Sequence, residues 1–146
     1  MKNILDNLSD LGITLPEPIK PIANYVPYVI TNNIVYISGQ IPLNKEKIIY
    51  RGKVGKDINI IEGKKAAELC IINTLSILNQ ATEYNLLKVL KCVKITVFIN
   101  SVSSFTEQPE IADGASDLLK RLFGHAGEHS RSAVSCISLP RNAAVE

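Results

Sequence analysis

The chain has 146 residues, 46% of them apolar, and its 16 Lys and Arg against 14 Asp and Glu give a formal net charge of +2. This length suits one domain. Such a domain can bury roughly 68–70% of its unfolded surface and build a core without disulfides or structural metals. The small charge argues against a nucleic-acid-binding protein, which needs a basic patch or stripe. Residues 1–6 lack the apolar stretch of an export signal, and no apolar run could span a bilayer, so we expect a cytoplasmic protein.

The chain opens with a short helix and a proline-rich connector. In residues 2–11 the apolar positions Ile4, Leu8 and Leu11 fall on one helical face, and Gly12 can end the helix. Three prolines then fix an extended segment over residues 15–21. We therefore divide the chain into an N-terminal helical extension, residues 1–15, and one domain, residues 16–146.

Strands come next in the sequence. Residues 25–30 and 34–38 are rich in β-branched and aromatic side chains, and the turn residues 31–33 between them predict a hairpin. Residues 48–51 predict a short third strand.

Two long helices alternate with the remaining strands. Apolar residues at helical spacing predict helices over residues 60–84 and 104–124. The second helix has Ser104 or Thr106 as expected N-caps, Pro109 in its first turn and Gly124 as its C-cap. Alternating apolar residues predict strands over 89–100 and 131–139, and a further strand begins at residue 144.

This order predicts an α+β fold, a mixed sheet with both long helices on one face and a short N-terminal helix beside them. The other face of the sheet needs a cover if it is apolar. A second subunit is the obvious one, so the pattern favours an oligomer.

Cysteines and histidines give weak signals. Cys70, Cys92 and Cys136 lie far apart without metal-ligand spacing, which favours buried free thiols over a catalytic cysteine. His125 and His129 lie in a glycine-containing segment and are expected to be exposed loop residues. A contact with substrate, or much less a metal site, stays open as an alternative.

Arg131 is the residue most suggestive of chemistry. It follows the histidine segment and opens an apolar strand, where a guanidinium can offer a bidentate fork to a carboxylate. A surface ion pair is the competing interpretation. Glu146 and Tyr25 are unremarkable by themselves, and phosphate-loop, nucleophile-elbow and zinc-protease motifs are missing from the sequence. The residues alone therefore identify no reaction.

Three segments resemble the YjgF/RidA family, also known as endoribonuclease L-PSP. They are the strand V-Y-I-S-G-Q-I-P at residues 35–42, the helix start at residues 62–67 with the later strand at 93–99, and S-R-S-A-V at residues 130–134 followed by Leu-Pro and Val-Glu. The third is the most specific, because it fixes several residues at set spacings. The resemblance covers about residues 16–146.

The resemblance implies a chorismate-mutase-like fold and homotrimers with a site in each cleft between subunits. It assigns Arg131 to the substrate carboxylate and Glu146 to activation of water. Tyr25 would line the cleft, Gly39 would lie at its tight turn, and Ala133 would offer a backbone carbonyl. This chain departs from better-known members in having Ala133 where many have cysteine, and in its Ala-Asn-Tyr-Val-Pro-Tyr segment at residues 23–28.

The implied activity is hydrolysis of reactive 2-imino or enamine acids to 2-oxo acids and ammonia, without metal or cofactor. Glu146 would serve as general acid and base. Two alternatives stay open: a trimer that binds small carboxylates without turnover and, less favoured, an endoribonuclease. Neither nucleic acid nor membrane is expected as a partner.

Overall fold

A computed structural model describes residues 2–18, 24–45 and 47–146. The helices and strands are α1 (Ile4–Asp10), β1 (Tyr28–Thr31), β2 (Ile34–Ile37), β3 (Leu43–Asn44), β4 (Lys47–Ile48), α2 (Ile60–Ala81), β5 (Lys94–Asn100), α3 (Gln108–Phe123) and β6 (Ser130–Cys136). Three single-turn 3₁₀ helices complete the set: η1 (Leu86–Lys88), η2 (Gly124–Gly127) and η3 (Pro140–Asn142).

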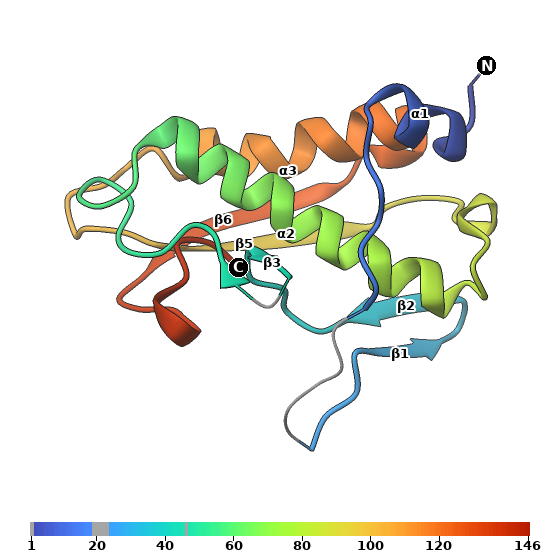
Figure 1. The fold of residues 1–146 in the computed structure, drawn as a ribbon, viewed down its shortest axis with the longest axis horizontal. Helices are drawn as coiled ribbons and strands as arrows, with labels where there is room; N and C mark the ends of the chain where they lie inside the picture. Colours follow the sequence, from blue (N-terminus) through green and yellow to red (C-terminus); the bar gives the residue numbers. More distant parts are fainter. Residues whose placement is uncertain (1, 19–23, 46) are drawn as a thin grey trace.

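The long helices α2 and α3 pack side by side across one face of the strands (Figure 1). β5 and β6 run parallel. The last residues of the chain pair with β5 in the antiparallel sense, because Phe98 and Glu146 exchange backbone hydrogen bonds of 2.8 and 2.9 Å. The predicted α+β class, with a mixed set of strands and both long helices on one face, is confirmed.

The first hairpin follows the sequence prediction. β1 and β2 are antiparallel, with Val29 opposite Tyr36. The turn residues Asn32 and Asn33 have φ of 47° and 61°. Two left-handed residues in succession give the turn whose twist matches antiparallel strands, and asparagine tolerates that conformation well.

The predicted third strand was wrong. The strand in this region is β4, Lys47–Ile48, and it pairs with β3, which the sequence pattern missed because it is only two residues long. Arg51 makes one isolated bridge to Ala143 instead. Gly52, with φ of +108°, turns the chain immediately afterwards and prevents a longer ladder.

Several boundaries also differ from the prediction. Strand β1 begins at Tyr28 rather than residue 25, and β6 ends at Cys136 rather than residue 139. Strand β5 begins at Lys94 rather than residue 89, because residues 86–88 form η1, whose N-cap Asn85 accepts a hydrogen bond from Leu87. Helix α2 ends at Ala81, since Glu83 and Tyr84 are left-handed. The expected N-caps of α3 were wrong: the helix starts after Glu107 without a side-chain cap.

Two end signals of α3 were confirmed, and α2 has a cap that the sequence analysis did not predict. Pro109 lies in the first turn of α3, and Gly124 ends that helix with φ of 59°. Helix α2 begins at a capping box in which the Asn59 and Glu62 side chains each accept a 2.9 Å bond from the other residue's backbone N–H.

Helix α1 belongs to the same core as the rest of the chain. Ile4 and Leu8 are buried in it, and the Asn7 side chain donates a 2.8 Å hydrogen bond to the Leu122 carbonyl at the end of α3. The division at residue 15 stays a prediction. Among the described residues, no helix is both long enough and apolar enough to cross a membrane.

Candidate functional site

Arg131 lies near the start of β6, opposite Ile95. Its Nη1 donates to Oδ1 of Asp113 at 2.9 Å and to Oγ of Ser116 at 3.0 Å, both on α3. Within the described part of the chain, Nη2 and Nε have no hydrogen-bond partner, and the side chain is 26% exposed. One side of the guanidinium is thus fixed by the helix, while the N–H groups on the other side are free to donate to a carboxylate.

A hydrogen-bond relay holds this arrangement in place. His129 Nδ1 lies 2.6 Å from the Gly127 carbonyl, and its Nε2 lies 3.0 Å from Ser116 Oγ. A carbonyl only accepts, so Nδ1 carries a proton, and in the neutral imidazole Nε2 then accepts from the Ser116 hydroxyl. The same hydroxyl oxygen accepts from Arg131. The relay fixes Ser116, and Ser116 helps to fix the guanidinium.

The two histidines therefore differ. His125 has a side chain that is 95% exposed and lies 3.3 Å from Glu128, in line with the expectation for an exposed residue. His129 is partly buried and bonded to α3, so the expectation of an exposed loop histidine was wrong there. In residues 2–18, 24–45 and 47–146, no three potential ligands gather as a metal site would require.

Glu146 lies in a second cluster with Gly39. A Cβ on Gly39 would come within 2.1 Å of Glu146 Oε1, so only glycine leaves room for this carboxylate. Tyr25 precedes Val26, whose carbonyl accepts a 2.7 Å bond from the hydroxyl of Ser38, the neighbour of Gly39. Tyr25 is 56% exposed. Gly39 and Glu146 thus lie together, and the backbone next to Tyr25 contacts the residue before Gly39.

The thiols near Glu146 are poor nucleophiles. Burial raises the pKa of Cys70 far above its ordinary value, and the charge of Glu146 raises it further. Burial and then Glu146 also raise the pKa of Cys136. Both thiols stay protonated near neutral pH, whereas thiolates are the reactive form. The preference for free, structural cysteines over a catalytic one agrees with this environment.

Arg131 and Glu146 face opposite sides of the sheet within one chain. Glu146 pairs with Phe98, which points away from the buried neighbours Val97 and Ile99, whereas Arg131 reaches towards α3. Three residues along β5 and two strand spacings put their backbones on the order of 14 Å apart. Ala133 pairs with Val97 and packs against the core on the side of Arg131.

Sequence reasoning missed the residues that fix Arg131 and the segment before Glu146. Asp113 and Ser116 have the i,i+3 spacing of one helical face, yet nothing local signals their contact with a strand 15–18 residues later. Asn100 was read only as the end of a strand. Its buried amide donates to the carbonyls of Gly52 and Ala143 at 3.3 and 3.1 Å, and its Oδ1 accepts from Lys53 at 2.9 Å. A polar residue closing an apolar strand was the available signal.

Comparison with known proteins agrees with this fold. Residues 6–145 match the model of the family described as "YjgF/chorismate mutase-like, putative endoribonuclease". The chain is 43% identical over 141 residues to Protein TCP17 of Trypanosoma cruzi, a match covering 96% of this chain and 88% of that protein.

Solved structures extend the likeness to the whole fold. The protein Atu1372 from Agrobacterium tumefaciens, of unknown function, is 40% identical, with a TM-score of 0.90 over 97% of this chain and 86% of its own. A protein from Shewanella oneidensis described as "a putative endoribonuclease" is 33% identical, with a TM-score of 0.94 over 99% and 95% of the two chains.

Proposed function

The chain belongs to the YjgF/chorismate mutase-like family, and we propose that it hydrolyses reactive 2-imino or enamine acids to 2-oxo acids and ammonia. The observation that carries the proposal is Arg131. Asp113 and Ser116 fix one side of its guanidinium and leave the other side for a carboxylate. Every 2-imino acid has that carboxylate next to its C=N carbon.

We propose that the complete site forms between subunits of a homotrimer. Arg131 and Glu146 face opposite sides of the β5–β6 sheet, so a single chain cannot bring both to one small substrate. Arg131 of one subunit would meet the cluster of its neighbour. The apolar open face of the sheet, where Phe98 and Val134 are 39% and 45% exposed, supplies a surface for this assembly.

The chemistry needs only positioning and one proton relay. The substrate carboxylate binds Arg131, and Glu146 accepts a proton from a water molecule that adds to the C=N carbon. Glu146 then returns the proton to nitrogen, and the tetrahedral carbinolamine collapses to the 2-oxo acid and ammonia. Gly39 leaves the Glu146 carboxylate room beside the substrate.

A non-catalytic trimer that binds small carboxylates would use the same arginine. Calorimetric binding of 2-oxo acids, without ammonia release from any imino acid, would select that function. An endoribonuclease is favoured only by the descriptions of the family and of several relatives, among them the Shewanella protein. RNA cleavage that survives stringent purification and is lost in an Arg131 variant would select it instead.

The direct test follows ammonia release from freshly generated 2-imino acids with a panel of side chains. Arg131→Ala should lower kcat/KM roughly 100-fold or more, since two charged hydrogen bonds are worth about 3 kcal/mol or more. Arg121→Ala, which changes an exposed arginine in the last turn of α3, is the matched control and should keep full activity. Full activity in an Arg131→Ala protein of unchanged assembly would refute the proposal.

A further inference from the structure

The Nη1 atom of Arg131 carries two hydrogens and has two acceptors on α3. These are Asp113 Oδ1 at 2.9 Å and Ser116 Oγ at 3.0 Å. In a planar guanidinium whose Nη1 is occupied in this way, Nε–H and one N–H of Nη2 point together along the remaining edge. The two donors of that edge match the two oxygens of a carboxylate. The contacts with α3 therefore decide which edge of Arg131 a substrate meets.

The Ser116 hydroxyl can accept from Arg131 because it has an acceptor for its own hydrogen. Nε2 of His129 lies 3.0 Å from Ser116 Oγ, and Nδ1 of the same ring lies 2.6 Å from the Gly127 carbonyl. In the neutral imidazole the hydrogen bonds then run in one direction, from Arg131 through Ser116 and His129 to the backbone. Each group in the relay donates forwards and accepts from behind.

The packing of Gly127 fixes the far end of this relay. Gly127 is buried, and a Cβ added there would lie 2.3 Å from the Leu119 carbonyl oxygen of α3. A glycine lets the backbone lie this close to the helix. The carbonyl that accepts from His129 therefore has a set position relative to Ser116, and both nitrogens of the partly buried ring have a partner.

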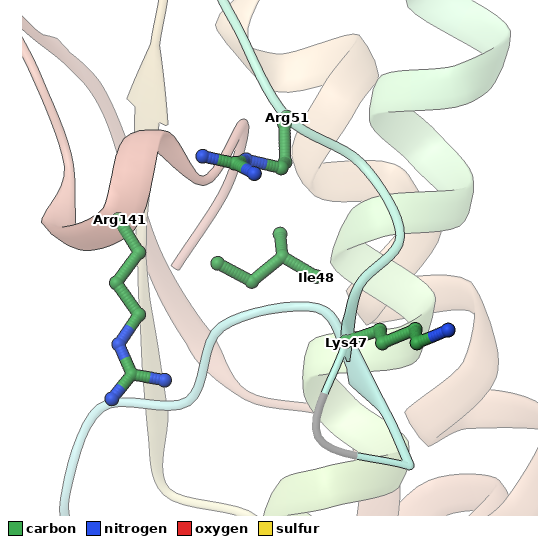
Figure 2. Close-up of a pocket in the computed structure, with 4 residues that line it drawn as sticks. All are labelled: Lys47, Ile48, Arg51 and Arg141. Carbon is green, nitrogen blue, oxygen red and sulfur yellow. The ribbon is translucent and has the colours of Figure 1, made fainter.

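Two other arginines of the chain are not held in this way. Figure 2 shows Arg51 and Arg141 with Ile48 between their side chains and their guanidinium groups pointing apart. Both arginines are exposed, and no carboxylate of the described residues lies within 4.0 Å of either. Such a side chain loses its rotamer freedom when it binds a ligand, whereas the orientation of Arg131 is set beforehand.

We propose that His129 is a positioning residue for the substrate carboxylate. Through Ser116 it keeps the Nε–Nη2 edge of Arg131 directed towards the carboxylate of a 2-imino acid. This inference rests on the proposed role of Arg131 in the deaminase. Without an acceptor at Nε2, the Ser116 hydroxyl is no longer oriented and Nη1 loses part of its support. Substrate binding then has to order the guanidinium, which weakens binding in the ground state and the transition state alike.

Glutamine and asparagine at residue 129 separate the roles of the two ring nitrogens. The amide oxygen of glutamine reaches about as far as Nε2 and can accept from Ser116. The shorter asparagine amide reaches about as far as Nδ1, so it can donate to the Gly127 carbonyl but leaves Ser116 without its acceptor. Calorimetry with 2-oxobutanoate measures the carboxylate site by itself, and ammonia release from the corresponding imino acid gives KM and kcat.

His129→Asn should weaken the binding of 2-oxobutanoate about tenfold and raise KM about as much, while kcat stays within a few-fold. His129→Gln should restore both values to within about threefold of the wild type. His125→Asn is the matched control, because the side chain of His125 is 95% exposed, and it should bind as the wild type does.

Two further measurements test whether His129 acts through Ser116. Ser116→Ala should weaken binding about as much as His129→Asn, and the double variant should bind no more weakly than either, because residues of one hydrogen-bond network are not additive. In the wild type at mildly alkaline pH, nitrogen-15 NMR of the His129 ring should find the proton on Nδ1 and none on Nε2.

Equal losses in His129→Gln and His129→Asn, losses that add in the double variant, or a proton on Nε2 would overturn the positioning role. The proposed deaminase can fail separately. A wild type that binds 2-oxobutanoate with the expected pattern of variants but releases no ammonia would support the positioning role and refute the deaminase. A wild type that releases ammonia and keeps its KM in His129→Asn would refute the positioning role alone.

Discussion

At the scale of single residues, a substitution at Gly39, which contacts Glu146, should lower activity and leave stability nearly unchanged. A Gly39→Ala methyl group would displace the flexible end of the Glu146 side chain, whose Oε1 lies 2.1 Å from the new Cβ position. Moving a partly exposed side-chain end costs little folding energy, but it shifts the proposed catalytic carboxylate. We expect kcat to fall at least about tenfold, as misplacement of a general base does, while the melting temperature stays within a few degrees.

Steady-state kinetics and a thermal melt of the same preparation measure both effects. Ser38→Ala, which removes the neighbouring hydroxyl but adds no atom beside Glu146, is the control and should keep kcat within a few-fold. A Gly39→Ala protein with unchanged kcat would show that Glu146 need not occupy this position.

The buried thiol of Cys70 predicts a pH dependence of stability. Burial raises its pKa in the folded state, so the folded protein retains this proton while the unfolded chain loses it above pH ~8.5. The unfolded state then binds fewer protons, and the free energy of unfolding falls as pH rises, by up to about 1.4 kcal/mol per pH unit for one group. The stabilisation is fully present below pH ~8.5.

Urea unfolding between pH 7 and 10, compared for the wild type and Cys70→Ala, measures this contribution. The variant should show a shallower decline above pH ~8.5 than the wild type. Identical slopes would mean that Cys70 ionises as easily in the folded protein as in the unfolded chain.

At the scale of elements, the packing of α2 on α3 depends on Gly114. An added Cβ there would lie 2.0 Å from the Lys64 carbonyl oxygen, a backbone atom of α2 that cannot move by itself. Gly63 of α2 in turn faces α3, but a Cβ added there would meet only the flexible end of the Ile111 side chain, at 2.5 Å. Alanine is otherwise about 1 kcal/mol better than glycine within a helix.

We therefore expect Gly114→Ala to destabilise the fold by about 3 kcal/mol or to prevent folding, as overpacking does, and Gly63→Ala to cost distinctly less. Denaturant unfolding monitored by circular dichroism compares the two. Equal stabilities would indicate that the helices can move apart without loss.

The sequence predicted long elements well and short ones poorly. The apolar stripes of α2 and α3 extend over several turns, so each helix was found, with Gly124 marking an end. The two-residue strand β3 and the 3₁₀ turn η1 are too short to show a period. Their positions are set by tertiary hydrogen bonds, such as those from Asn73 Nδ2 to the carbonyls of Ile41 and Leu43 at 3.0 and 3.1 Å.

The candidate site, too, was predicted from the sequence only in part. Arg131 and Glu146 were named because a multi-residue motif carries them, and their roles stay predictions. The anchors of Arg131 could not be found, because a hydrogen bond between α3 and β6 depends on how the helix docks. The pairing of Arg51 with Ala143 likewise joins segments with no local relation.

At the scale of the whole molecule, the open face of the sheet predicts self-association. Phe98 and Val134 are neighbours on β5 and β6, and Val29 and Tyr36 on the first hairpin are 53% and 58% exposed. An exposed apolar surface of this kind marks an interface with another subunit or protein. Sedimentation should give three times the mass of one chain.

Val134→Glu should shift the protein towards monomers, because a charge buried in an apolar interface lacks a partner. Leu90→Glu, at a residue that is 88% exposed outside the strands, is the matched control and should stay assembled. A Val134→Glu protein that sediments like the wild type would place the interface elsewhere.

We propose that Arg131 of one subunit completes the site formed by Glu146 of another. The most direct test of this proposal mixes two inactive proteins, Arg131→Ala and Glu146→Gln, after mild dissociation and reassembly. Random trimers would regain about a quarter of the wild-type ammonia release, because some sites then take an intact residue from each chain. Activity that stays at the level of the separate variants, in trimers shown by mass spectrometry to be mixed, would contradict the claim.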